Sequence, residues 1–281
     1  MPQVSQNPRV TFAIRHEDEH LVVVEKPSGR VTQPGVGHQH DTLLNGLYAK
    51  YERRLSQLGE KRDHGLVHRL DRETSGLLAI ALSRPAYDGL RAAFEARTVR
   101  KFYWAVVKKA PTEPKGVIRL PIEESVRRKD RYTSVKRAKI SSEGKPALTA
   151  YRLLAESPYA AMIEARPITG RMHQIRVHMN AINAPVLGDD LYAPATLQNS
   201  APRLALHAHR IAFEHPVTGE QIDVRSPWPR DLRSLLRKLS LPRPDLPGEQ
   251  SGQPRDEDDS TDAGDELRGD PIGEQDTGLG E

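Results

Sequence analysis

The sequence predicts a mixed α+β domain with a largely antiparallel β-sheet core and flanking helices. Strand-like apolar segments outnumber helical patterns, and the two do not alternate regularly as they would in a doubly wound parallel sheet. Hydrophobic residues make up 37% of the 281 residues, which is enough for a sizeable core. No internal repeat divides the chain.

The strands are predicted from short runs of aliphatic and aromatic residues bounded by polar or turn-forming ones. Such runs are β-rich in composition and too short for buried helices. Five segments meet this description: Leu21 to Glu25, Leu77 to Ala81, Phe102 to Val107, Thr149 to Leu154 and Ala160 to Ala165.

Two helices are predicted from three- and four-residue spacing. In Pro85 to Thr98, the side chains of Leu90, Phe94 and Arg97 fall on one stripe, and a proline suits the first turn. The second helix runs from about His173 to Ile182, and Asn183 is placed to end it in a left-handed cap.

The charge is distributed unevenly along the chain. Residues 243–281 carry 13 acidic residues against three arginines, a net charge of −10, which leaves +14 on the first 242 residues. The tail is rich in Pro, Gly and Ser and lacks a core-forming pattern, so it should be disordered. We expect an N-terminal extension over residues 1–10, a catalytic body over 11–240 and an acidic tail over 241–281. A basic body attracts polyanions such as nucleic acid, although a merely soluble surface is the alternative.

The composition also restricts the location and the chemistry. There is no cysteine, which excludes disulfides, thiolate metal sites and a cysteine nucleophile and favours a reducing cytoplasm. The longest apolar runs fall far short of a membrane span, and residues 1–10 lack the apolar segment of a secretion signal. We therefore expect a cytoplasmic protein that does not bind membranes.

The densest group of polar side chains lies in residues 67–76, Val-His-Arg-Leu-Asp-Arg-Glu-Thr-Ser-Gly, just before the strand at Leu77. A loop of this composition feeding a buried strand is a place where a scaffold presents an active group. The alternative is a structural turn in which Asp71, Thr74 and Ser75 bond their own backbone. These residues alone leave both interpretations open.

Several common sites do not fit the sequence. His68 to Asp71 lacks the features of a kinase catalytic loop, and Gly35 to His40 lacks the third glycine of a dinucleotide fingerprint. His173 and His178 are five residues apart, whereas a helical zinc pair needs four. Asp71 and Glu73 are too close in one loop to flank a sugar as glycosidase carboxylates do. We expect no metal and no cofactor.

The chain resembles the RluA family of pseudouridine synthases. The resemblance is carried by His68-Arg69-Leu70-Asp71 with Thr74-Ser75-Gly76, and it extends in order over roughly Thr11 to Pro229. The other blocks are Glu25 to Gly29, Lys101-Phe102-Tyr103, Pro167 to His178, Gly188-Asp189 and Leu206-His207-Ala208. The resemblance implies the pseudouridine synthase fold and, as in members that have no separate N-terminal RNA-binding domain, RNA recognition by the catalytic body itself.

The resemblance also implies three catalytic residues. Asp71 corresponds to the nucleophile, which must be a carboxylate to hold the sugar or the ring while the base rotates. Tyr103 corresponds to the tyrosine that stacks on the uracil and can take part in proton transfer. Arg176, on the second predicted helix, would pair with Asp71 and keep it ionised.

RNA-binding positions follow from the same match. Arg69 would enter the gap left when the target base flips out of the stack. A basic cluster near residue 128 would grip phosphates, with a solvated charged face as the alternative. The full set of implied RNA contacts is His68, Arg69, Thr74, Arg128, Lys129, Arg131, Arg171, His173, Gln174 and Ile175.

The implied activity is isomerisation of uridine in a stem-loop of large-subunit (23S) rRNA, of tRNA, or of both, by a monomer. Two alternatives stay open. The chain could modify a different tRNA site with the same chemistry, or it could be a non-catalytic RNA-binding protein with this fold. The intact set of Asp71, Tyr103 and Arg176 favours an enzyme.

Overall fold

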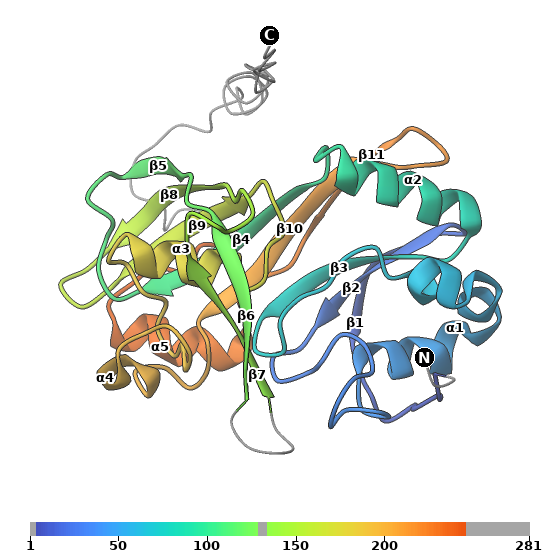
Figure 1. Cartoon of the computed structure of the whole chain (residues 1–281), viewed down its shortest axis with the longest axis horizontal. Helices are drawn as coiled ribbons and strands as arrows, with labels where there is room; N and C mark the ends of the chain where they lie inside the picture. The colour runs from blue at the N-terminus through green and yellow to red at the C-terminus, as the bar shows by residue number, and fades with distance from the viewer. Residues whose placement is uncertain (1–3, 129–133, 246–281) are drawn as a thin grey trace, which may run out of the picture.

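A computed structural model describes residues 4–128 and 134–245, in which the dominant feature is one mixed sheet (Figure 1). Nine strands form it in the order β1-β2-β3-β10-β4-β9-β8-β5, with β11 also paired to β10. All neighbours are antiparallel except β3 and β10, which run parallel. The bounds are β1 Ala13–Glu17, β2 Leu21–Lys26, β3 Ser75–Ala81, β4 Arg100–Val107, β5 Lys115–Ile118, β8 Thr149–Glu156, β9 Ala161–Pro167, β10 Leu206–Glu214 and β11 Gln221–Arg225.

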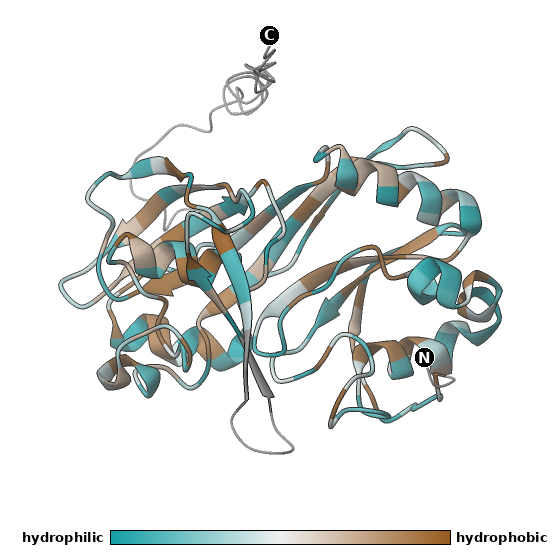
Figure 2. Ribbon diagram, viewed as in Figure 1, coloured by the Kyte–Doolittle hydropathy of each residue, from teal (hydrophilic) through white to brown (hydrophobic). Residues whose placement is uncertain are grey.

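Strands β2 and β3 are buried on both faces, which explains their continuous apolar sequence. Alternate side chains point to opposite sides of a strand. Val22 and Ile80 pack with α1 (Leu43–Leu58), and Val23 and Ala79 pack with α2 (Arg84–Glu95). These strands appear brown between the two helices in Figure 2. The two helices therefore sandwich this end of the sheet.

The other half of the sheet carries a second core. It is built around Trp104 on β4, Met162 on β9 and Trp228, with α3 (Gln174–Ala181) and α5 (Arg233–Lys238) packed against it. Leu241 is also buried there, one residue into the segment expected to be a tail. The remaining elements are α4 (Ala195–Gln198) and two short 3-10 turns, Glu60–Gly65 and Arg230–Leu232.

A two-stranded hairpin stands apart from the main sheet. It consists of β6 (Ile122–Arg128) and β7 (Ser134–Ile140), and it projects from the body in front of the sheet (Figure 1). Its base is attached to the body because Ile122 and Ala138 are buried against Val177 of α3.

The predicted fold class is confirmed, and all seven predicted elements are present with shifted ends. One prediction is wrong in a way that matters below. The first predicted helix ends at Glu95, and Arg97, which was placed on its stripe, has a left-handed backbone with φ 60°. Asn183 has the left-handed backbone expected of it, also with φ 60°. Helix α1 and strands β1, β5, β6, β7, β10 and β11 were not predicted.

Candidate active site

The loop before β3 is held by side chains from another part of the chain. Lys26, which is fully buried, donates from Nζ to the carbonyl oxygen of Arg72 at 3.0 Å. Ser28 donates to the carbonyl oxygen of Glu73 at 2.6 Å, and Thr32 donates to that of Leu70 at 2.9 Å. Three hydrogen bonds from one segment thus fix the backbone on both sides of Asp71.

Burial lowers the pKa of Lys26 to about 7, although Asp71 and Glu73 oppose the shift. Its ammonium also donates to the carbonyl oxygens of Pro27 and Arg30, at 2.9 Å and 2.7 Å. Such a buried amine, with all its bonds directed to backbone, organises the loop rather than contacting substrate.

Gly76 brings the loop close to the centre of the sheet. Its φ is +123°, and a Cβ atom there would lie 2.3 Å from the carbonyl oxygen of Ala208 on β10. Only glycine permits this approach. Next to it, Ser75 forms a 2.9 Å hydrogen bond with Nδ1 of His207. The Thr74-Ser75-Gly76 block therefore joins β3 to β10.

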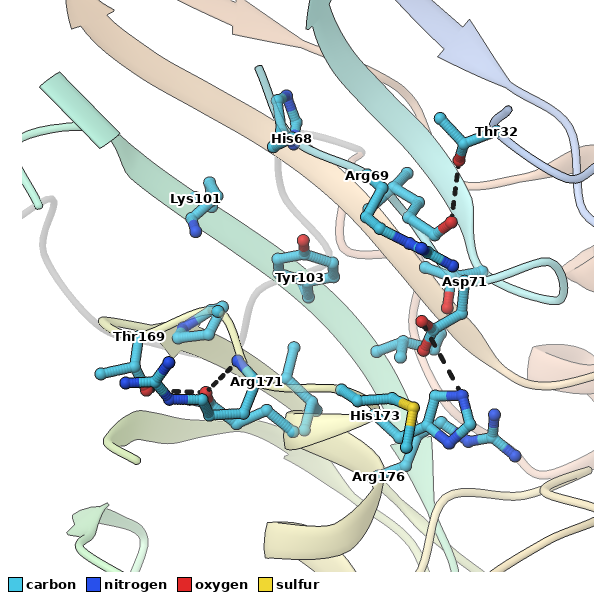
Figure 3. A pocket seen from close by; sticks show the side chains of 18 of the residues that line it. Thr32, His68, Arg69, Asp71, Lys101, Tyr103, Thr169, Arg171, His173 and Arg176 are labelled. Atoms are coloured by element: carbon cyan, nitrogen blue, oxygen red, sulfur yellow. Dashed lines mark hydrogen bonds and ion pairs between the residues drawn. The ribbon is translucent and has the colours of Figure 1, made fainter. Parts of the chain in front are cut away.

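Asp71 lies in a cleft of about 830 Å³ between the two halves of the sheet. One backbone hydrogen bond fits the structural-turn alternative: the N–H of Thr74 donates to the carbonyl oxygen of Asp71, at 3.2 Å. The carboxylate itself faces the cleft, where Tyr103 and Arg176 also lie (Figure 3). The fold thus brings together the three predicted catalytic residues, from a loop, from β4 and from α3.

Tyr103 is half-buried on the floor of this cleft. Burial, and then the charge of Asp71, raise the pKa of its hydroxyl well above the usual value. The phenol therefore stays protonated at neutral pH and can donate a hydrogen bond, but it cannot act as a phenolate base.

Arg176 is paired differently from what the resemblance implied. It forms a bidentate ion pair with Asp189, with Nε–Oδ2 and Nη2–Oδ1 distances of 2.8 Å and 2.6 Å, and Nη2 lies 3.1 Å from Asp190. Between the described residues no ion pair joins it to Asp71 within 4.0 Å. Burial would lower the pKa of Arg176, but Asp189 raises it above the usual value, with smaller contributions from Asp71 and Asp190. The charge of Asp71 thus reaches Arg176 at a distance rather than by direct contact.

His173 lies close to the Asp71 carboxylate, with Nε2 3.9 Å from Oδ1. The other ring nitrogen, Nδ1, is 2.7 Å from the hydroxyl of Tyr192, which also accepts the backbone N–H of Ala138 at 2.9 Å. The hydroxyl has its own proton free for Nδ1, so neutral His173 carries its proton on Nε2, facing Asp71. Burial lowers the pKa of His173, while Asp71 opposes the shift, which favours this neutral form.

The predicted RNA-binding residues fall into two groups. Arg69 and Arg171 line the cleft with side chains that reach solvent, and Thr74 lines it with a buried hydroxyl that has no partner among the described residues. His68, His173, Gln174 and Ile175 also line it, but they are tied into the fold. Gln174 forms four hydrogen bonds, Ile175 is buried in the core, and Nε2 of His68 accepts the N–H of Ala79 at 3.0 Å.

The basic cluster is only partly visible. Lys129 and Arg131 lie outside the described residues, and Arg128 is described only as the last residue of β6. Farther along the hairpin, Arg137 and Lys139 are exposed, and Lys139 pairs with Glu123 at 3.2 Å. Phosphate binding by this cluster stays a prediction.

Comparison with known proteins identifies the family of this chain. A family model described as RNA pseudouridylate synthase matches residues 20–181. The chain belongs to this family. Its members are isomerases that act on RNA, and the matched residues include the loop of Asp71, Tyr103 and most of α3.

Individual pseudouridine synthases are similar over most of the chain. Ribosomal large subunit pseudouridine synthase D of Zymomonas mobilis is 38% identical over 243 residues, covering 83% of this chain and 74% of that protein. The dual-specificity RNA pseudouridine synthase RluA of Pasteurella multocida is 39% identical over 219 residues, covering 76% and 92%. The structure of human RNA Pseudouridylate Synthase Domain Containing 4 superposes with a TM-score of 0.64 at 28% identity, over 83% of this chain and 95% of that one.

Within residues 4–128 and 134–245, no three His, Asp or Glu side chains are grouped so as to hold a metal ion. No helix in those ranges is long and apolar enough to cross a membrane.

The site contains residues that sequence reasoning missed. Asp189, which pairs with Arg176, belongs to the block Gly188-Asp189 that resembles the family, but it was assigned no role from the sequence. Lys26 stood in another. Tyr192 lay outside all blocks, and nothing in the sequence near it signals that its hydroxyl would join the hairpin to His173.

Proposed function

We propose that this pseudouridine synthase flips a uridine out of a structured RNA and isomerises it with Asp71 as the nucleophile. In the net reaction the bond from N1 to C1′ breaks, a bond from C5 to C1′ forms, and a proton leaves C5 while N1 gains one. Substrate and product have the same atoms, so no second substrate, metal or cofactor is required by the balance.

The observation that carries the proposal is the placement of the Asp71 carboxylate. Its loop is fixed on both sides by Lys26, Ser28 and Thr32, while its side chain is only 27% exposed and faces the cleft. A carboxylate restrained in this way can attack one carbon and then release it, as a covalent catalyst must.

Tyr103 and Arg69 would handle the base. The ring of Tyr103 forms part of the cleft floor, so an extruded uracil can stack on it while the protonated hydroxyl donates to the base or the sugar. Arg69 is exposed two residues before Asp71, and its guanidinium can fill the gap in the RNA stack. Opening the stack requires a few kcal/mol, which such a residue would offset.

The proposed substrate is a stem-loop of 23S rRNA, of tRNA, or of both. One similar protein is named for the large ribosomal subunit and another for dual specificity, with almost equal identity to this chain, 38% and 39%. The basic body, at +14 without the tail, supports binding to either RNA. We further propose that the enzyme works as a monomer in the cytoplasm. The acidic tail predicted over residues 241–281 lies outside the described residues from position 246 onward.

The test is Asp71→Asn, which keeps the size of the side chain but removes the carboxylate. We expect pseudouridine formation in total cellular RNA or in a transcribed stem-loop to be lost, with RNA affinity and thermal stability nearly unchanged. Activity within about tenfold of wild type would contradict a nucleophilic role. Mapping pseudouridine in RNA from cells that lack the protein would identify the target position.

A further inference from the structure

Two basic side chains that line the cleft have no acidic partner among the described residues. Arg97 follows α2, Lys101 lies near the start of β4, and both line the cleft next to Phe94. Throughout residues 4–128 and 134–245, no carboxylate lies within 4.0 Å of either charged group, and neither side chain donates a hydrogen bond. The nearby acid Glu95 is already paired with Arg91, at 3.2 Å.

Arg97 occupies a backbone position that favours glycine. The N–H of Arg97 bonds to the carbonyl oxygen of Phe94 at 3.2 Å, and the N–H of Thr98 bonds to that of Ala93 at 3.0 Å. This is the Schellman pattern of a helix end, with Arg97 at the left-handed residue, φ 60°. A residue with a side chain is disfavoured there. The backbone at this position favours glycine, so the arginine is not explained by the helix end, and its exposed guanidinium is accessible to a ligand.

Lys101 is a half-buried ammonium group without an anionic partner. It points to the same side of β4 as Tyr103, two residues farther on, whereas Phe102 between them is buried on the other side (Figure 3). Its Nζ lies 5.4 Å from the centre of the Phe94 ring, a contact that orients the amine but does not neutralise it. Burial lowers the pKa of Lys101 to about 8, and no carboxylate contributes to the shift. An anionic ligand would stabilise this group.

We propose that Arg97 and Lys101 form a phosphate-binding site that holds the RNA backbone next to the target uridine. The inference rests on the proposed function, because it places RNA in this cleft. Two residues of a strand span about 7 Å, so a base stacked on Tyr103 and a phosphate on Lys101 belong to the same or adjacent nucleotides. The guanidinium of Arg97 can bind two phosphate oxygens, and Lys101 adds a point charge.

In this proposal the RNA backbone and the target base bind to different parts of the cleft. The carboxylate of Asp71 would repel phosphate, so the RNA backbone is drawn to the wall of Arg97 and Lys101 while the neutral base and sugar meet Asp71. Phosphate contacts fix register without reading sequence. Arg97 and Lys101 are therefore binding residues that position the target nucleotide, distinct from the residues that act on it.

The test uses Arg97→Gly and Lys101→Met, with Lys109→Met as the matched control. Lys109 is exposed just beyond the other end of β4 and does not line the cleft, so this control removes the same charge elsewhere. Binding of the full chain to a fluorescent oligouridylate of about ten nucleotides, a length within the usual range for single-strand sites, is measured by anisotropy over a range of salt. Each cleft variant should bind on the order of tenfold more weakly and reduce the slope of log affinity against log salt by about 0.7.

Thermal unfolding separates this role from a structural one. Arg97→Gly should keep or raise the Tm while weakening RNA binding, because glycine suits the left-handed position. If Arg97 had only a structural role, Arg97→Gly would lower the Tm and leave the salt dependence of RNA affinity unchanged. The site is disproved if both cleft variants bind with the affinity and salt slope of Lys109→Met.

Neutral linkages locate the phosphate. In a stem-loop substrate with single methylphosphonate linkages, the wild-type protein should lose affinity at one or two positions, and Lys101→Met should lose little more there. If Lys101→Met lost as much affinity as the wild-type protein at every methylphosphonate position, the assignment would be wrong. These readouts measure binding alone, so an altered salt slope in a protein that makes no pseudouridine would support the site and refute the proposed function.

Discussion

Replacing Asp189 with alanine tests how the buried charge pair maintains the active site. Asp189 and Arg176 have side chains only 1% and 3% exposed, and the carboxylate accepts both guanidinium hydrogen bonds. Its Oδ1 also accepts the N–H groups of Leu191 and Tyr192, at 2.9 Å and 3.0 Å. Asp189→Ala therefore leaves a buried cation and two backbone donors without their acceptor.

Breaking a buried pair in this way typically destabilises a protein by about 3 to 5 kcal/mol. Asp190 is 60% exposed and stays 3.1 Å from Arg176, so the lower end, about 3 kcal/mol, applies. With a slope of about 3 kcal/mol per molar urea, the unfolding midpoint should fall by about 1 M. The fluorescence of the two buried tryptophans, Trp104 and Trp228, reports the transition.

The control is Asp190→Ala, whose exposed carboxylate should contribute less than about 1 kcal/mol. The double variant Arg176→Met with Asp189→Leu should recover most of the stability and no activity, because apolar side chains replace the pair without leaving a charge. A loss below about 1 kcal/mol for Asp189→Ala would refute the reasoning that this pair holds α3 and the Asp189 loop together.

Three further predictions concern RNA and the tail. Arg69→Ala should lower single-turnover rates on the order of 10- to 1,000-fold for a paired target and far less for an unstacked one, with little rescue by Arg69→Lys; equal losses would exclude a flipping role. Truncation after Leu241, which is buried, should leave Tm and turnover unchanged, and a lower Tm would contradict a dispensable tail. RNA affinity should fall as pH rises from about 7 to 9, because Lys101 is protonated below its pKa of about 8 and loses its charge above it, and Lys101→Met should lack this step. Arg69 and Arg97 keep their charge over that range. Lys26, with a pKa of about 7, also titrates there, but its amine is buried and bonded to backbone carbonyls, so a step of the same size in Lys101→Met would assign the titration to Lys26 or another group.

Activity should also survive exhaustive chelation on a substrate whose folding does not need magnesium. Activity lost with EDTA and restored by zinc would indicate a metal site that the described residues do not reveal.

The sequence by itself determined the fold class and the reaction family. The continuous apolar runs of β2 and β3 and the order of the motif blocks are local properties that a linear pattern records. Asp71, Tyr103 and Arg176 could be located in this way, and the structure brings them to one cleft. Helix α1 could have been found as well, since Leu43, Leu47, Tyr51 and Leu55 recur at four-residue spacing and are all buried.

Only the tertiary structure decided which charges meet. Arg176 pairs with Asp189 rather than Asp71 because the loop after α3 folds back over it, and no spacing in the sequence encodes that return. The parallel pairing of β3 with β10 brings together residues more than 130 positions apart, as in the contact of Ser75 with His207. The left-handed Arg97 and the unpaired Lys101 likewise became visible only when their neighbours in space were known. Ion pairs and backbone strain depend on distances of a few ångströms between distant segments, and a one-dimensional pattern does not contain those distances.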